Sequence, residues 1–175
     1  MHGRTHTGWY PGRVDGMSTV IIEGPDGAGK STLIRRLLEE HPEYQYAPRA
    51  CSSLGGPLLG ADLVAYLVQY GTMGGAIYDR HPVISGAVYD AIARRPPDIA
   101  TGPYLRRAFQ WITENARVIY CRPPMGTIMQ AVAISPQMTG VARNIYRITE
   151  TYDSIMHHLI PHETYDWTAD DLPDL

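Results

Sequence analysis

The chain has 175 residues, 44% of them hydrophobic, which suits one folded domain with its own core. Its formal net charge is −3, so the composition does not indicate a surface built to neutralise the phosphates of a nucleic-acid duplex. Two isolated cysteines, Cys51 and Cys121, argue against a disulfide framework and a clustered zinc site and favour a reducing, cytoplasmic setting. No apolar run reaches the roughly 18 residues of a membrane span, so we expect no membrane partner.

Residues 1–16 combine glycines with basic side chains and show neither helical nor strand periodicity. We expect a flexible N-terminal extension here, followed by a single domain over residues 17–175. A basic arm that contacts a polyanion is the alternative for the extension, and the composition leaves it open.

A short β-branched run over residues 19–22 leads into a phosphate-binding pattern, GxxxxGK(S/T). The segment Glu23-Gly24-Pro25-Asp26-Gly27-Ala28-Gly29-Lys30-Ser31-Thr32 matches that pattern in full. Apolar residues recur at helical spacing after it, so we place the motif between a strand and a helix. The backbone N–H groups of such a loop hold phosphate oxygens, Lys30 reaches the β- and γ-phosphates, and the Ser31 hydroxyl ligates Mg²⁺.

The motif predicts ATP as the donor and Mg²⁺ as a cofactor. A chance match to a glycine-rich turn is the alternative, and the flanking strand and helix argue against it. The residues expected to bind the nucleotide are Gly24, Asp26, Gly27, Ala28, Gly29, Lys30, Ser31 and Thr32.

The rest of the chain alternates short apolar strands with amphipathic helices. Strands are expected over residues 19–22, 44–48, 76–79, 117–121 and 162–167, and helices over 31–40, 58–70, 84–92, 104–115, 125–132 and 141–160. Because no hairpin signal joins the strands, this order predicts an α/β fold, with a five-stranded parallel sheet between helices on both faces. Gly24, Arg49, Asp79 and Arg122 would then gather at the carboxyl edge of the sheet.

Asp79 ends the third predicted strand, about fifty residues after Lys30. We predict that it holds Mg²⁺ together with Ser31, the alternative being a capping or turn aspartate. Arg80 follows at once, where an NTPase that hydrolyses ATP would need an acid or a glutamine to orient water. A guanidinium suits an anionic acceptor, so the pair favours transfer to a bound acceptor over hydrolysis.

The phosphate-binding segment, followed by Asp79-Arg80 with Ser85 and Tyr89, resembles the thymidylate kinase group of nucleoside-monophosphate kinases. That family carries patterns close to EGxDGAGKST and DRYxxSxxAY. The resemblance implies a three-layer P-loop kinase fold, ATP as donor and Mg²⁺ as cofactor. It also implies that Arg80, Ser85 and Tyr89 bind the acceptor and that Asp26 lies at the acceptor's 3′-hydroxyl.

A fainter resemblance joins Pro48-Arg49 and Gly55-Gly56-Pro57-Leu58 to the REPGGT segment of the same family. It implies that Arg49 grips the acceptor phosphate. The segment 133–142, where the family often carries arginines in a lid, has none here. Only Arg122, Arg143 and Arg147 are nearby, and we take Arg122 and Arg143 as the candidates to serve the lid.

Two features open a second acceptor hypothesis. The spacing before Asp79 is shorter than the family usually has, and Asp79-Arg80-His81-Pro82 is closer to kinase-like proteins of bacterial viruses than to the DRY pattern. Some viral P-loop kinases phosphorylate 5-hydroxymethyluracil within DNA, which requires a flipped-out base. The two acceptor hypotheses are thus a free thymidylate-like deoxynucleoside monophosphate and a modified base in DNA.

We predict in-line transfer of the γ-phosphoryl group, with catalysis by positioning and charge stabilisation. If the acceptor is an alcohol, Asp26 or Asp79 would take its proton. A non-catalytic ATP-binding module is the third hypothesis, and oligomeric state, including a homodimer, stays open. The candidate catalytic residues are Lys30, Asp26, Asp79, Arg80, Arg122 and Arg143.

Overall fold

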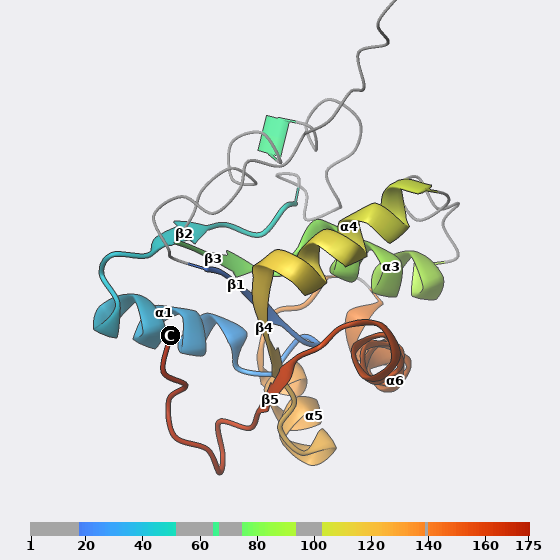
Figure 1. Cartoon of the computed structure of the whole chain (residues 1–175). Coiled ribbons are helices and arrows are strands. Elements are labelled where there is room, and N and C mark those ends of the chain that lie inside the picture. Colours follow the sequence, from blue (N-terminus) through green and yellow to red (C-terminus); the bar gives the residue numbers. More distant parts are fainter. Residues whose placement is uncertain (1–17, 52–64, 67–74, 94–102, 139) are drawn as a thin grey trace, which may run out of the picture.

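The computed structural model describes residues 18–51, 65–66, 75–93, 103–138 and 140–175 (Figure 1). The predicted extension over residues 1–16 lies outside the described residues. So does the predicted helix over 58–70, except for Ala65 and Tyr66, which are helical. Among the described residues, no helix is both long and apolar enough to cross a membrane.

Five parallel strands form the central sheet, as the sequence predicts. They are β1 (Thr19–Glu23), β2 (Gln45–Ala47), β3 (Ala76–Asp79), β4 (Ala116–Cys121) and β5 (Glu163–Tyr165), in the order β2-β3-β1-β4-β5. The central strand β1 pairs with β3 and β4, with Ile22 opposite both Asp79 and Ile119. This register brings the loop after β1 and the turn after β3 to the same edge of the sheet.

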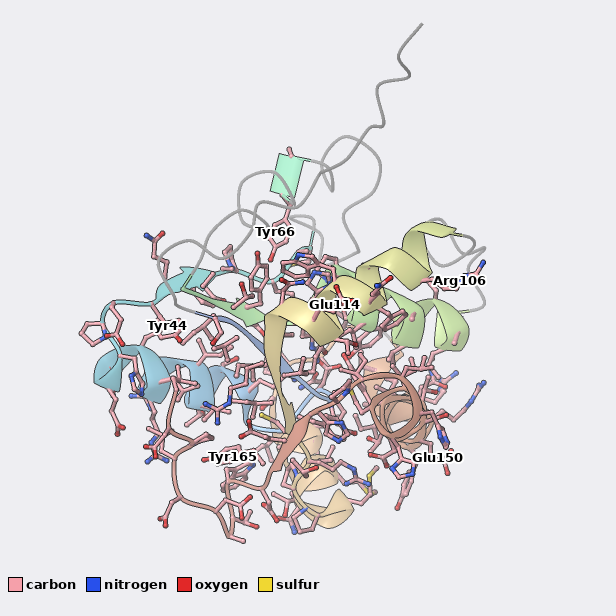
Figure 2. All side chains as sticks on the ribbon, in the orientation of Figure 1. Tyr44, Tyr66, Arg106, Glu114, Glu150 and Tyr165 are labelled. Atoms are coloured by element: carbon pink, nitrogen blue, oxygen red, sulfur yellow. The ribbon has the colours of Figure 1, made fainter. Side chains whose placement is uncertain are left out.

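Helices cover both faces of this sheet, which confirms the predicted three layers (Figure 1). Because side chains alternate along a strand, Val20 and Ile22 of β1 pack toward α1 (Lys30–Glu40), while Ile21 packs toward the opposite layer. That layer contains α3 (Pro82–Ala93), α4 (Pro103–Asn115), α5 (Met125–Ile134) and α6 (Val141–Leu159). Figure 2 shows side chains filling the spaces between the sheet and its helices, with Arg106 of α4 and Glu150 of α6 at the periphery.

The last strand is shorter than the predicted 162–167, because a turn begins at Asp166. The Asp166 N–H donates to Asp170 Oδ2 at 2.6 Å, and the Asp170 N–H donates back to the Asp166 carbonyl at 2.8 Å. These bonds remove Asp166 and Trp167 from the strand ladder. The chain beyond the turn forms no helix, and Leu172 and Leu175 pack against the core beneath α1.

Candidate active site

The phosphate-binding loop joins β1 to α1 at the carboxyl edge of the sheet. Gly24 has a φ of 139°, and a Cβ there would lie 2.5 Å from the Cys121 carbonyl oxygen of β4. Gly29, which precedes the first residue of α1, has a φ of 85°. Both positions favour glycine, since residues with a side chain rarely adopt these angles. The loop therefore lies tightly against the sheet and leads directly into a helix N-terminus, the arrangement that binds phosphate.

A cavity of about 380 Å³ opens beside this loop. Loops from three neighbouring strands and the segment after β5 bring polar side chains to its wall. The residues at its wall that the sequence singled out are Asp26, Gly27, Gly29, Lys30, Ser31, Thr32, Arg49, Asp79 and Arg80. The expected ligands of the donor, the metal ion and the acceptor thus line one space.

Lys30 is held inside the loop, where its Nζ donates a hydrogen bond to the Pro25 carbonyl at 2.6 Å. Burial and the nearby positive charge of Arg80 lower the pKa of Lys30 to about 8. Incoming phosphate oxygens could replace the carbonyl as the partner of Nζ. Because they would be anionic, they would favour the charged lysine.

Asp26 is the centre of the acceptor side of the cavity. It accepts hydrogen bonds from Arg80 Nη2 at 3.0 Å and from the Tyr89 hydroxyl, while Arg49 Nη1 lies 4.0 Å from Oδ1. Burial alone would raise its pKa, but the charges of Arg80 and Lys30 hold the pKa of Asp26 at about 2. Asp26 is therefore ionised across the physiological range and can accept a hydrogen bond from a ligand hydroxyl.

Arg80 lies deeper than its expected role implies. The residue is 1% exposed, and its backbone adopts a φ of 67°, in the left-handed region. One guanidinium nitrogen is bonded to Asp26, and Nε and Nη1 have no partner among the described residues. By contrast, the Arg49 side chain is 32% exposed at the same cavity and lies 5.9 Å from the Tyr89 ring centroid. Arg49 is thus the more accessible of the two guanidinium groups.

Glu23, which directly precedes Gly24 of the loop, is a residue to which the sequence analysis assigned no role. Its side chain is fully buried, and its Oε1 accepts a hydrogen bond of 2.7 Å from the His81 backbone N–H. Burial raises the pKa of Glu23 to about 7, against the opposing effect of that bond and of the Arg80 charge. The sequence signal that could have indicated its burial is its position, since an acidic residue directly follows the apolar strand residues and precedes the phosphate-binding loop.

The expected Mg²⁺ ligands fit a magnesium site. The exposed Ser31 and the carboxylate of Asp79 line the same cavity. Mg²⁺ prefers oxygen ligands and is held in kinases by one or two protein groups together with substrate phosphates. Within the described part of the chain, no cluster of three or more acidic, histidine or cysteine side chains could hold a metal ion.

Six predicted site residues are absent from the described cavity wall, namely Gly24, Ala28, Ser85, Tyr89, Arg122 and Arg143. Of these, Tyr89 reaches the site through its bond to Asp26, and three have other partners or positions. Arg122 is paired with Asp153 of α6: its Nε donates to Oδ1 at 2.8 Å and its Nη2 donates to Oδ2 at 3.0 Å. Arg143 is exposed on α6, and the Ser85 hydroxyl donates to the His81 carbonyl at 3.1 Å in the first turn of α3. The part of the cavity wall that the structure describes therefore contains no lid arginine.

Trp167 is a second residue that sequence reasoning missed. It lines the cavity and is 47% exposed, and a Cβ on Gly29 would lie 2.6 Å from its Cδ1. The turn between Asp166 and Asp170 holds it there, with the Thr168 N–H and hydroxyl both donating to Asp166 Oδ1. The indole ring is thus fixed against the phosphate-binding loop, with much of its surface still open to a ligand.

Comparisons with known proteins bear on the fold. No protein-family model matches the sequence, and no curated protein matches it significantly. The YorR protein from Bacillus subtilis, solved in complex with phosphorylated GDP, superposes with a TM-score of 0.64 at 23% identity, over 87% of each chain. Deoxyadenosine kinase from M. mycoides, solved with bound dATP, gives a TM-score of 0.57 at 14% identity, over 88% of this chain and 93% of the kinase. These likenesses show that the chain shares its α/β fold with both proteins.

Proposed function

We propose that this protein is an ATP- and Mg²⁺-dependent kinase that transfers a phosphoryl group to a deoxynucleotide, a thymidylate-like deoxynucleoside monophosphate. The observation that carries the proposal is the cavity beside the phosphate-binding loop. There, Lys30 at the start of α1, Asp79 at the end of β3 and Arg49 in the segment after β2 come together. Phosphoryl transfer depends on positioning and on charge stabilisation, and this arrangement offers both.

The order of the strands supports separate places for the two substrates. The segment after β5 brings Trp167 to one flank of the phosphate-binding loop, and the segment after β2 brings Arg49 to the cavity from the opposite edge of the sheet. We place the base of the donor against Trp167, because a half-exposed indole offers a stacking surface. The acceptor would then approach from the side of Arg49, which is compatible with in-line transfer.

The groups of the loop would act on the donor phosphates. Lys30 would exchange its bond to the Pro25 carbonyl for phosphate oxygens, and the backbone N–H groups of the loop would hold the rest of the triphosphate. Ser31 and Asp79 would hold Mg²⁺, which neutralises charge on the β- and γ-phosphates when bound.

The ionisation of Asp26 favours a phosphate acceptor over an alcohol. A carboxylate with a pKa of about 2 is a weak base, so it is poorly suited to take a proton from a hydroxymethyl group. It is well suited to accept a hydrogen bond from the free 3′-hydroxyl of a monophosphate, whose own phosphate needs no base and could pair with Arg49. Within a DNA strand that 3′-oxygen is esterified and has no proton to donate.

A panel of acceptors tests the proposal. Purified protein is incubated with γ-labelled ATP and Mg²⁺, together with each deoxynucleoside monophosphate, with DNA containing 5-hydroxymethyluracil, or with no acceptor. We expect label on one or more monophosphates and no transfer by Lys30→Met. Label on DNA alone would replace the monophosphate with the modified base, and ATP binding without any transfer would support a non-catalytic module.

A matched pair of variants tests the acceptor side. Arg49→Gln should raise the KM of the acceptor by about tenfold to a hundredfold and leave the KM of ATP within about twofold, because a charge-assisted phosphate contact is lost on one substrate only. Arg106→Gln, which removes an exposed guanidinium from α4, is the control. Equal effects of the two substitutions would exclude a specific contact of Arg49 with the acceptor.

A further inference from the structure

A cluster of buried polar atoms lies behind the cavity. Among the described residues, four buried side-chain atoms lack a hydrogen bond of ordinary geometry: Glu23 Oε2, Arg80 Nε, Arg80 Nη1 and Tyr152 Oη. They belong to three neighbouring residues, because the Tyr152 hydroxyl lies near enough to lower the pKa of the Glu23 carboxyl, and Glu23 lies within electrostatic range of Arg80. Buried polar groups without partners are rare in proteins, and their concentration at one place marks a site that function shapes.

The guanidinium of Arg80 is bonded to one carboxyl group and lies within electrostatic range of a second. Its Nη2 bonds to Asp26 at 3.0 Å, and the second carboxyl is that of Glu23, which is fully buried at the end of β1. The ring of Tyr89, with its centroid 5.3 Å from the Arg80 Cζ, covers a further side of the guanidinium. Arg80 is thus enclosed by protein groups and holds Asp26 in place instead of offering a free charge to solvent.

The backbone of the same turn needs support. A non-glycine residue with a φ of 67° is in a sparsely populated conformation, which persists only where its surroundings fix it. Two hydrogen bonds from β1 fix it here: the Arg80 N–H donates to the Ile22 carbonyl at 3.0 Å, and the His81 N–H donates to Glu23 Oε1 at 2.7 Å. The second bond is the one that a side chain supplies.

We propose that Glu23 is a positioning residue for phosphoryl transfer, which aligns the Asp79–Arg80 turn with the phosphate-binding loop. The inference rests on the proposed function. Glu23 is the last residue of β1, so the strand that leads into the loop also holds the turn that carries Asp79, the expected metal ligand. Because Arg80 belongs to the same turn, its bond to Asp26 depends on that alignment as well.

The test compares Glu23→Ala, Glu23→Gln and Glu40→Gln. The alanine removes the acceptor of the His81 N–H, the glutamine keeps an oxygen for it, and Glu40→Gln makes the same acid-to-amide change at an exposed position on α1. ATP binding is measured by calorimetry with Mg²⁺ and with a chelator, since the ratio of the two affinities reports how well the Asp79 side of the site is aligned.

Binding of ATP to wild-type protein should tighten about tenfold or more when Mg²⁺ is added. Glu23→Ala should lose most of that gain and keep its Mg²⁺-free affinity within about twofold, because the phosphate-binding loop is intact. Glu23→Gln should restore at least part of the gain. With an acceptor identified, kcat of Glu23→Ala should fall by about tenfold or more, with the KM of ATP changed far less.

A full Mg²⁺ gain in Glu23→Ala would overturn the positioning role. The positioning role would also be overturned if Glu23→Ala lost its affinity for ATP equally with and without Mg²⁺, in proportion to the fraction of protein that is unfolded. That pattern would indicate a residue needed only for folding. Failure of the wild-type protein to bind ATP would instead overturn the proposed function, and the inference with it.

Discussion

The buried carboxyl of Glu23 makes a quantitative prediction about stability. Replacing it with glutamine removes one ionisable group and leaves an oxygen of similar size and place. Burial raises the pKa of Glu23 from 4.5 to about 7, and at about 1.36 kcal/mol per pKa unit this shift corresponds to about 3 kcal/mol. This contribution makes the free energy of unfolding of the wild-type protein depend on pH. Glu23→Gln has no ionisable group at this position and lacks the contribution.

The direction of the effect follows from the protons bound in each state. Between pH 4.5 and about 7 the carboxyl is ionised in the unfolded chain and still protonated in the folded protein, so folding takes up a proton. The stability that this group contributes is therefore present at low pH and is lost as the pH rises through this window. From pH 5 to pH 8 the loss amounts to about 2.5 kcal/mol.

The pKa shift of His81 changes the free energy of unfolding in the opposite direction and offsets much of the loss due to Glu23. Burial lowers the pKa of His81 from 6.5 to about 4, so the unfolded chain binds the extra proton between these values, and stability rises with pH. That gain is about 2 kcal/mol from pH 5 to pH 8. These two groups should nearly cancel in the wild-type protein, whereas in Glu23→Gln the rise due to His81 should appear.

Urea unfolding at pH 5 and pH 8 measures the effect in wild type, Glu23→Gln and the control Glu40→Gln. The difference in unfolding free energy between Glu23→Gln and wild type should move by about 2.5 kcal/mol in favour of the variant as the pH rises. The control should move by less than about 0.5 kcal/mol, because exposed substitutions away from special features are nearly neutral. A pH-independent difference for Glu23→Gln would refute the argument that Glu23 folds into its buried place protonated.

Three further predictions concern the binding of ATP and the role of Arg122. At pH 8 about half of the Lys30 side chains are neutral, because the pKa of Lys30 is about 8, so the protein should take up about half a proton per ATP as phosphate restores the charge. Calorimetry in two buffers of different ionisation enthalpy measures this uptake. Equal heats of binding in both buffers would refute it. Trp167→Ala should weaken ATP binding about tenfold and leave inorganic triphosphate binding unchanged, whereas Tyr146→Ala should alter neither. Arg122→Gln and Asp153→Asn should each lower the free energy of unfolding by at most about 1 kcal/mol, and the double variant should lose less than the sum of the two, because both remove the same ion pair. The kcat of each variant should stay within about threefold of the wild-type value. A loss of about 10³ in kcat for Arg122→Gln alone would instead make Arg122 a transition-state arginine.

The elements that sequence predicted well are those whose signal is local. The phosphate-binding loop, the five strands and most helix bounds depend on periodicity and on turn residues within one segment, and these survive in the structure. The missed turn after β5 was also partly local, since Asp166 and Asp170 bond to the backbone between them. The apolar and aromatic character of 162–167 hid that signal, and Trp167 was therefore placed in a strand.

Other features depend on contacts between distant segments. Nothing near Arg122 in the sequence indicates that Asp153, 31 residues later, would occupy its guanidinium. The burial of Arg80 likewise requires that α6 and the end of β1 close over the turn after β3. Residue identity alone therefore suggested an arginine that binds the acceptor phosphate, while tertiary packing buries Arg80 and bonds it to Asp26.

The distribution of buried polar residues connects stability with the site. Among the described residues, six polar or charged side chains are buried, and Glu23, Lys30, Arg80 and His81 all belong to the phosphate-binding loop or to the turn that faces it. Burial disfavours the charged form of each of these four groups. A sequence selected for stability alone would replace such residues with apolar ones, because desolvated charges are costly even when they are paired. Their concentration around one cavity is therefore the arrangement expected where binding an anionic ligand, and not folding, sets the choice of residues.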